Sequence, residues 1–289
     1  MLDIPWEVIQ QGIINGLALG WVYILMALGL TLIFGIMKIM QLAHGEIYML
    51  SSYIVYYLTA SSGLDFYLAI AISIVSMAIL GIVLETFLFR LVRGQFMAPI
   101  VVSVSLILIL QSMAVVLFGL YERSLPRLAE GSFNIYGSII PADRIVAVCF
   151  ALILIVLLYL FLKRTKHGQA MVASAQNRDG ALLQGISSNT MSIIAMAIGC
   201  SLASAGGALA GSLFTMSPTM GMQPLLKGLV IIVIGGMGSL LGAAIGGTFL
   251  GLIDTLTPIL LNPAAAAILP LLIVILFLLL RPQGLFGHE

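Results

Sequence analysis

Charged residues are scarce in this sequence: they make up 8% of its 289 residues, against a hydrophobic share of 61%. A soluble domain carries about 25% charged residues, which keep its surface in water. So few charges exclude an ordinary soluble protein, and the net charge of +1 indicates no nucleic-acid partner. The composition predicts an integral membrane protein. Because no linker or charge block divides the chain, we expect one transmembrane domain over residues 1–289.

Cysteine is also nearly absent, since only Cys149 and Cys200 occur, each within an apolar run. Two such residues form neither a disulfide framework nor a metal-binding pattern, and we expect both to be buried packing residues. The three histidines are far apart in the sequence, so no metal site is predicted. The first residues include Asp3 and Glu7 in place of Lys or Arg, which favours an uncleaved anchor over a signal peptide.

Motifs for catalysis and nucleotide binding are missing as well. The sequence has no H-E-x-x-H, no G-x-S-x-G and no Walker A phosphate loop. We therefore expect no enzyme activity and no bound cofactor in this chain. If ATP drives transport through it, another polypeptide must bind ATP and Mg.

Long apolar runs, in contrast, fill most of the chain. A helix needs about 20 mostly apolar residues to cross a bilayer. Candidate spans are 9–37, 42–60, 66–89, 97–120, 145–162, 191–214, 229–256 and 264–280. Glycines interrupt the run 229–256, which predicts one kinked span or two short ones. The chain then crosses the membrane eight or nine times, and we favour nine.

The distribution of positive charge predicts the orientation. Eight of the twelve Lys and Arg residues can lie on one side, which the positive-inside rule makes cytoplasmic: Lys38, Arg90, Arg93, Lys163, Arg164, Lys166, Arg178 and Arg281. The polar segment 163–189 and the C-terminus are then cytoplasmic, and the N-terminus is outside. Residues 121–144 form an external loop, either a solvated connector or a docking surface for an extracytoplasmic partner.

Small residues recur at four-residue spacing on three predicted helices. The glycines concerned are Gly12, Gly16 and Gly20, then Gly207 and Gly211, then Gly242 and Gly246. In lipid, such stripes let helix backbones approach closely. The pattern leaves open whether they pack within this chain or against a second subunit.

Polar residues and glycines break two of the apolar runs. Residues 38–46 contain Gln41, His44, Gly45 and Glu46, and residues 235–242 contain Gly235, Gly236, Met237, Gly238 and Ser239. Paired interruptions in the two halves of a chain indicate a transport pathway between inverted repeats. Glu46 is either a pathway or gate residue, or an acid in the first turn of a helix. Glu85 precedes Arg90 by about one turn, which predicts an ion pair at the membrane interface.

Three stretches of the sequence are typical of one known family: GLALGWVYILMALGLTLIFGIMKIMQLAHGE (16–46), GGMGSLLGAAIGG (235–247) and RPQGLFG (281–287). They resemble, in this order, the first part, the second Gly-rich element and the C-terminal signature of the permeases of branched-chain amino acid ABC importers. The resemblance covers essentially the whole chain. It implies an all-α polytopic fold of the type II-like importer class, with two interrupted helices related by an inverted repeat, in a bacterial or archaeal cytoplasmic membrane.

The resemblance also implies partners and a solute. A second homologous permease subunit completes the pore, two cytoplasmic ATPase subunits use ATP and Mg, and a periplasmic or extracytoplasmic binding protein delivers the solute. That solute would be a branched-chain or other amino acid, although members of the family also handle urea, amides and aromatic acids. The alternative is a stand-alone secondary transporter or facilitator for a small polar solute. The coupling ion of such a protein normally needs buried acids or the carbonyl groups of broken helices, and Glu46 and Glu85 are the only candidate acids.

The polar segment 163–189 resembles the family's coupling segment, which docks into a groove on the ATPase. The positions assigned to it are Gly168, Ala170, Ala173, Ser174, Asn177, Arg178, Asp179, Ala181, Leu183, Gly185 and Ile186. Val172 stands where the family has Arg, and Asn177 where it has Asp. We expect Gly168 to end the preceding helix and one helix to cover 169–184, with small residues against the ATPase. A merely solvated linker helix is the alternative.

Overall fold

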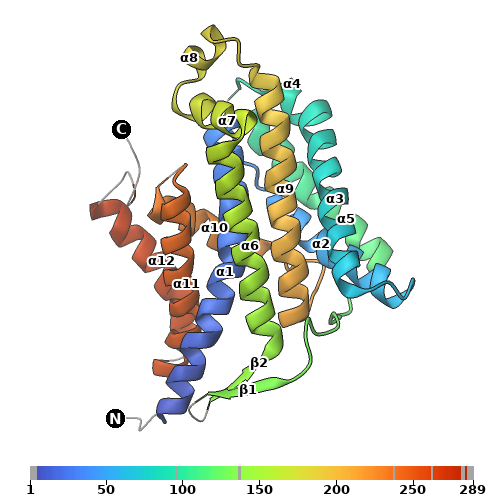
Figure 1. The fold of residues 1–289 in the computed structure, drawn as a ribbon, viewed down its shortest axis with the longest axis vertical. Coiled ribbons are helices and arrows are strands. Elements are labelled where there is room, and N and C mark those ends of the chain that lie inside the picture. Colours follow the sequence, from blue (N-terminus) through green and yellow to red (C-terminus); the bar gives the residue numbers. More distant parts are fainter. Residues whose placement is uncertain are drawn as a thin grey trace.

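The computed structural model describes residues 5–95, 97–135, 138–236, 238–261, 263–280 and 284. Its helices form one elongated bundle (Figure 1). In this described part, six helical segments are long and apolar enough to cross a membrane: Trp6–Met37 (α1), Phe66–Val92, Ala98–Phe118 (α5), Ala142–Arg164 (α6), Ser188–Leu213 (α9) and Leu240–Leu260 (α11). The chain is therefore a multi-pass membrane protein, as its composition predicts.

Three further helices complete the bundle. They are His44–Ala60 (α2, 17 residues), Met222–Gly235 (α10, 14 residues) and Pro263–Leu280 (α12, 18 residues). The interrupted run 229–256 is thus two helices, α10 and α11, and α10 begins earlier than the apolar run. α2 and α10 are each shorter than the roughly 20 residues that a full crossing needs.

The segment Phe66–Val92 is not one uniform helix. Asp65 begins it as an N-cap, accepting hydrogen bonds from the backbone N–H of Tyr67 (3.0 Å) and Leu68 (3.2 Å). The α-helix α3 (Phe66–Leu84) then continues as a π-helical stretch, η1 (Glu85–Phe89), and as the short helix α4 (Arg90–Val92).

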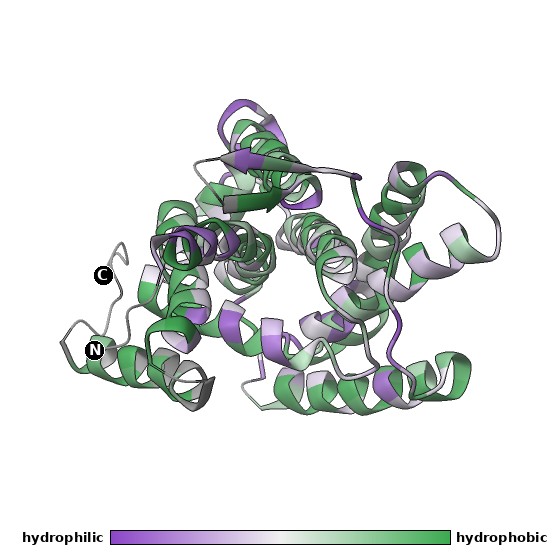
Figure 2. Cartoon of the chain, turned by 90° about the horizontal axis from the view of Figure 1, so that it is seen from below, coloured by the Kyte–Doolittle hydropathy of each residue, from purple (hydrophilic) through white to green (hydrophobic). Residues whose placement is uncertain are grey.

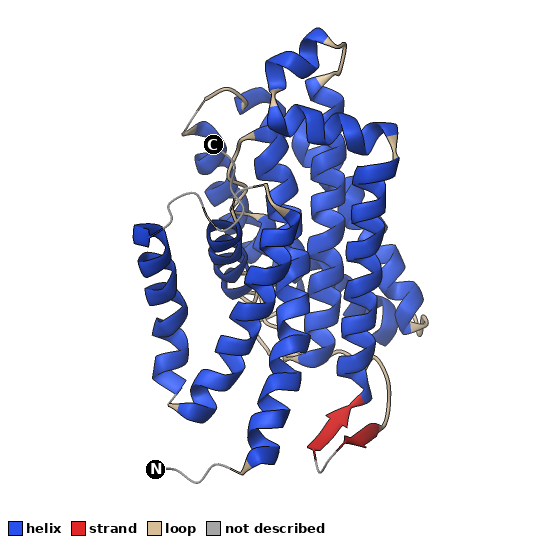
Figure 3. Ribbon diagram, turned by 60° about the vertical axis from the view of Figure 1, so that its left-hand side comes forward, coloured by secondary structure: helices blue, strands red, loops and turns tan. Residues whose placement is uncertain are grey.

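Short elements lie at the two ends of the bundle. Strands β1 (Ser132–Ile135) and β2 (Ser138–Pro141) pair antiparallel at the end where α1 begins (Figures 1 and 3). Helices α7 (Lys166–Gln176) and α8 (Arg178–Leu183) lie at the opposite end. Seen from the hairpin end, hydrophobic residues dominate the helices between them (Figure 2).

α1 and α9 form the core of the bundle. In each, 72% of the most apolar window is buried, against 22% in α5 and α6. Glycines allow this close packing, because Gly12, Gly16 and Gly20 of α1 all face α11. A Cβ on Gly20 would lie 2.8 Å from the carbonyl oxygen of Gly247. Gly207 likewise faces the α2 backbone, Gly211 faces Ser52, Gly242 faces Gly235, and Gly246 faces Ile231. These stripes pack against helices of the same chain.

Two expectations about single residues are wrong. Cys149 is exposed on α6, while Cys200 is buried as expected. An apolar residue on an outer helix of a membrane protein needs no burial, since lipid replaces the protein core. Glu85 does form an ion pair, but its partner is Arg93 in place of Arg90. The π-helical stretch between them changes the register in which side chains face each other.

Candidate functional site

The short helices α2 and α10 begin side by side inside the bundle. A Cβ on Gly45 would lie 2.9 Å from the carbonyl carbon of Gly221, so the two backbones touch. α2 runs parallel to α9, since Tyr48 meets Gly207 and Ser52 meets Gly211. α10 runs parallel to α1, and α1 runs antiparallel to α9, so α10 points opposite to α2. The two N-termini meet, and their positive helix-dipole ends converge at this junction.

Three buried polar side chains surround the junction. Gln41 is 1% exposed, His44 0% and Glu46 1%. The His44 ring fills the space beside Gly29, where an added Cβ would lie 2.6 Å from its Nε2. Glu46 lies in the first turn of α2, so its charge faces the positive end of the helix. The structure thus brings these residues of the first broken segment together.

Gln111 of α5 joins this cluster, although no sequence pattern indicates it. Its Nε2 donates a hydrogen bond of 2.9 Å to Oε1 of Glu46. Within the described residues, the other Glu46 oxygen, both polar atoms of the Gln41 amide and both His44 nitrogens have no hydrogen-bond partner. Buried polar atoms are normally paired with protein or water. The junction therefore has unused capacity to bind water or a polar solute.

A small cavity of about 50 Å³ lies beside the junction, between the end of α1 and α10. Gln41 supplies its polar lining, together with Leu30, Phe34, Ile39, Met40, Leu42, Leu229, Ile232 and Val233. This volume can hold water molecules, which need about 10–15 Å³ each by this measure.

The second Gly-rich element lies elsewhere, as the turn between α10 and α11. Gly236 (φ 95°) and Gly238 (φ 92°) adopt left-handed conformations, and Ser239 caps α11 by accepting a 3.0 Å hydrogen bond from the Gly242 N–H. Gly284 of the C-terminal signature packs against Gly236. Met237 lies outside the described residues. The 14 residues of α10 rise about 21 Å, so this turn and Glu46 lie at opposite ends of α10.

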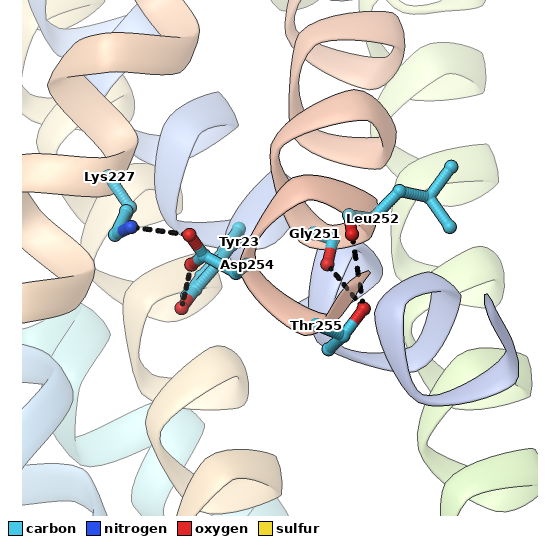
Figure 4. Close-up of polar contacts among 6 residues, drawn as sticks. All are labelled: Tyr23, Lys227, Gly251, Leu252, Asp254 and Thr255. Atoms are coloured by element: carbon cyan, nitrogen blue, oxygen red, sulfur yellow. Dashed lines mark hydrogen bonds and ion pairs between the residues drawn. The ribbon is translucent and has the colours of Figure 1, made fainter. Parts of the chain in front are cut away.

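A charged cluster ties α10 to its neighbours. Lys227 Nζ donates to Asp254 Oδ1 of α11 at 2.6 Å, and the Tyr23 hydroxyl of α1 donates to Asp254 Oδ2 at 3.0 Å (Figure 4). The Lys227 and Asp254 side chains are only 18% and 12% exposed. Sequence spacing could not reveal this pair, because the two residues lie on separate helices. An ionisable pair at membrane depth is a functional candidate by default.

The segment 163–189 forms two helices where one was expected. α7 ends at Gln176, and Asn177 caps α8 by accepting a 2.8 Å hydrogen bond from the Gly180 N–H. The preceding helix, α6, ends at Arg164, before Gly168. Gly168 lies in the first turn of α7, where its missing side chain lets α7 pack against the backbone of Phe161. Its expected role as the end of α6 is therefore wrong.

The small residues of this segment face the chain itself. Gly168, Ser174 and Ala181 are buried, and Ala170, Ala173 and Ile186 are partly buried. The exposed surface is formed by Asn177, Arg178, Asp179, Leu183 and Gly185, together with Val172 and Leu182. Leu183 is 88% exposed, and its neighbour Leu182 is 49% exposed.

Residues 12–278 match the family described as branched-chain amino acid transport system / permease component. The chain belongs to this family. It is 30% identical to the high-affinity branched-chain amino acid transport permease BraD of Pseudomonas aeruginosa, over 96% of this chain and 95% of that protein. It is 28% identical to LivH of Escherichia coli, over 96% and 95% of the two chains. It is 26% identical to a probable LivH of Methanocaldococcus jannaschii, over 92% and 89%.

The fold also resembles a solved structure, PsaBC from Streptococcus pneumoniae in complex with Fab. The TM-score is 0.52, with 13% sequence identity, over 94% of this chain and 92% of that one. Family membership confirms the resemblance found in the sequence, and the likeness supports the polytopic permease fold. The family is described as a permease component. Separately, the described residues contain no group of three His, Cys, Asp or Glu that could hold a metal ion.

Proposed function

We propose that this chain is the membrane-spanning permease subunit of an ATP-driven importer for a branched-chain or other amino acid. The observation that carries the proposal is the family match over residues 12–278. The names of the relatives support the solute class. A second permease subunit, two ATPase subunits that use ATP and Mg, and a binding protein would complete the importer.

The junction of α2 and α10 is the proposed gate of the translocation pathway. Gln41, His44, Gly45 and Glu46 surround it, and it offers polar atoms that have no hydrogen-bond partner in the described part of the bundle. The turn with Gly235, Gly236, Met237, Gly238 and Ser239 is the proposed hinge at the other end of α10. A rigid-body tilt of α10 about this turn would open the Gly45–Gly221 contact. In this proposal α10 is the moving element that links the two broken segments.

The function is tested by purifying the chain from membranes together with its neighbours and reconstituting the complex in vesicles. We expect an ATPase subunit to copurify, and leucine or another amino acid to enter the vesicles only when ATP is supplied on the ATPase side. Uptake without an ATPase and without ATP would instead support the stand-alone transporter or facilitator.

We further propose that the α7–α8 surface is the cytoplasmic docking site for the ATPase. Leu183→Asp is expected to weaken ATPase copurification about tenfold or more, because it puts a charge where an exposed apolar side chain would be buried by the partner. Leu183 has little packing to lose, as it is 88% exposed.

The matched control is Leu120→Asp, a similarly exposed leucine (75%) near the hairpin end of the bundle. We expect this variant to retain the ATPase in wild-type amounts. Equal retention of the ATPase by both variants would contradict docking at α8, and equal loss would indicate a general defect in folding.

A further inference from the structure

A buried ion pair lies where the end of α3 meets the start of α9. The Glu85 side chain is fully buried and pairs with Arg93, whose side chain is 8% exposed. The π-helical stretch η1 lies between them, and such stretches occur frequently at functional sites. A buried ion pair is often no more stable than apolar packing of the same volume. Its presence therefore points to a role beyond stability.

Arg93 has a second partner, on another helix. Its Nη1 donates a 3.0 Å hydrogen bond to Oδ1 of Asn189, the second residue of α9 and the last residue of the segment 163–189. A guanidinium can hold two acceptors in a fixed geometry because its donors form a rigid planar fork. Burial, and the charge of Arg178 at the start of α8, lower the pKa of Arg93. Arg93 therefore joins the end of α3 to the start of α9, the helix that directly follows the coupling helices α7 and α8.

The helices that meet at Arg93 also contact the helices that carry residues of the proposed gate. α9 packs against α1, α2 and α3, and η1 also contacts α5, which carries Gln111. Ser51 of α2 donates a hydrogen bond to the Ser204 carbonyl of α9, and the hydroxyl groups of Ser73 and Ser204 lie 3.2 Å apart between α3 and α9. A displacement of the α9 start or of α3 therefore acts on α2, the helix that carries Glu46.

We propose that Arg93 is a positioning residue that transmits movement of the coupling helices to the membrane helices, with Glu85 as its anchor and Asn189 as its link to the coupling segment. This inference rests on the proposed function. The ion pair holds the guanidinium to α3, while the exposed hydrogen bond to Asn189 lets it follow the segment 163–189. Removing the hydrogen bond between Arg93 and Asn189 therefore uncouples the movement of the coupling helices from that of the membrane helices. The Glu85–Arg93 pair stays intact, so no charge is left unpaired in the bundle.

Asn189→Ala is the decisive variant, since it cuts only the exposed link and leaves the Glu85–Arg93 pair in place. In vesicles containing the full importer complex, we expect the number of solute molecules imported per ATP hydrolysed to fall at least about fivefold, the lower range of coupling between two sites. ATPase copurification and the melting temperature should not change. Asn189→Asp keeps an acceptor oxygen for Arg93, so we expect it to restore the ratio to near the wild-type value.

Thr190→Ala is the matched control, because Thr190 is also exposed and lies next in the chain. A wild-type transport ratio in Asn189→Ala would overturn this inference and leave the proposed function standing. Loss of the ATPase from the Asn189→Ala complex would also overturn it, because Asn189 would then belong to the docking surface. Absence of ATP-driven uptake in the wild-type complex would overturn both proposals.

Discussion

Lys227→Met is expected to lower the free energy of unfolding by about 3 kcal/mol, because it leaves the Asp254 carboxylate without its cation inside the bundle. The two side chains keep 18% and 12% of their surface exposed, which places the effect at the lower end of the range for buried pairs. The Tyr23 hydroxyl alone cannot compensate the charge of the carboxylate. The measurement is thermal or denaturant unfolding of the purified protein in detergent.

The double variant Lys227→Met with Asp254→Leu separates a lost charge partner from lost packing. Removing both charges leaves no unpaired ion, so we expect most of the stability to return. If the destabilising effects of the two substitutions instead add, the loss of the ion pair is not the cause of the lower stability. A second readout, ATP-driven uptake, distinguishes structure from function. A stable double variant without uptake would show that the pair places α10 for transport.

Gly207→Ala is expected to destabilise the protein by about 3 kcal/mol, the upper range for an overpacked contact, because the new Cβ meets backbone that cannot move away. It would lie 2.8 Å from the carbonyl carbon and 3.0 Å from the Cα of Tyr48. α2 must then shift away from α9, which breaks the 2.7 Å hydrogen bond from the Ser52 hydroxyl to the Gly207 carbonyl. Since α2 carries Glu46, the junction with α10 moves as well.

Gly206→Ala is the adjacent control. Its new Cβ would lie 3.4 Å from the nearest atom, at the edge of the Tyr48 ring, which is an ordinary contact. Alanine also favours a helix over glycine by up to about 1 kcal/mol. We therefore expect this variant to be as stable as the wild type or slightly more so. Equal melting temperatures for the two alanine variants would argue against a backbone contact at Gly207.

The two broken segments lie at opposite ends of α10, and their glycines have different structural roles. The sequence predicts both as parts of one pathway because each interrupts an apolar run with glycine. In the structure, one of them surrounds the start of α10, and the other forms the turn at its end. At Gly45 the missing side chain allows close contact between two backbones, whereas Gly236 and Gly238 adopt left-handed conformations. The same residue type therefore has two physical uses, which spacing alone cannot separate.

The membrane class, the positions of the apolar helices and the family follow from the sequence by itself. Lipid requires long apolar helices, so runs such as 9–37 and 66–89 predict helices α1 and α3 to within a few residues. The family resemblance also rests on contiguous stretches of sequence. Local rules suffice for each of these features.

Only the tertiary structure decided which distant side chains meet. Gln111 reaches Glu46 from α5, Lys227 reaches Asp254 from α10, and Arg93 joins Glu85 to Asn189. A buried polar partner can come from any helix at the right depth, so sequence separation carries no information about it. For the same reason, the sequence does not show whether the small residues of α7 and α8 face this chain or a partner. Their burial depends on how the segment packs against α6 and α9, which no local pattern determines.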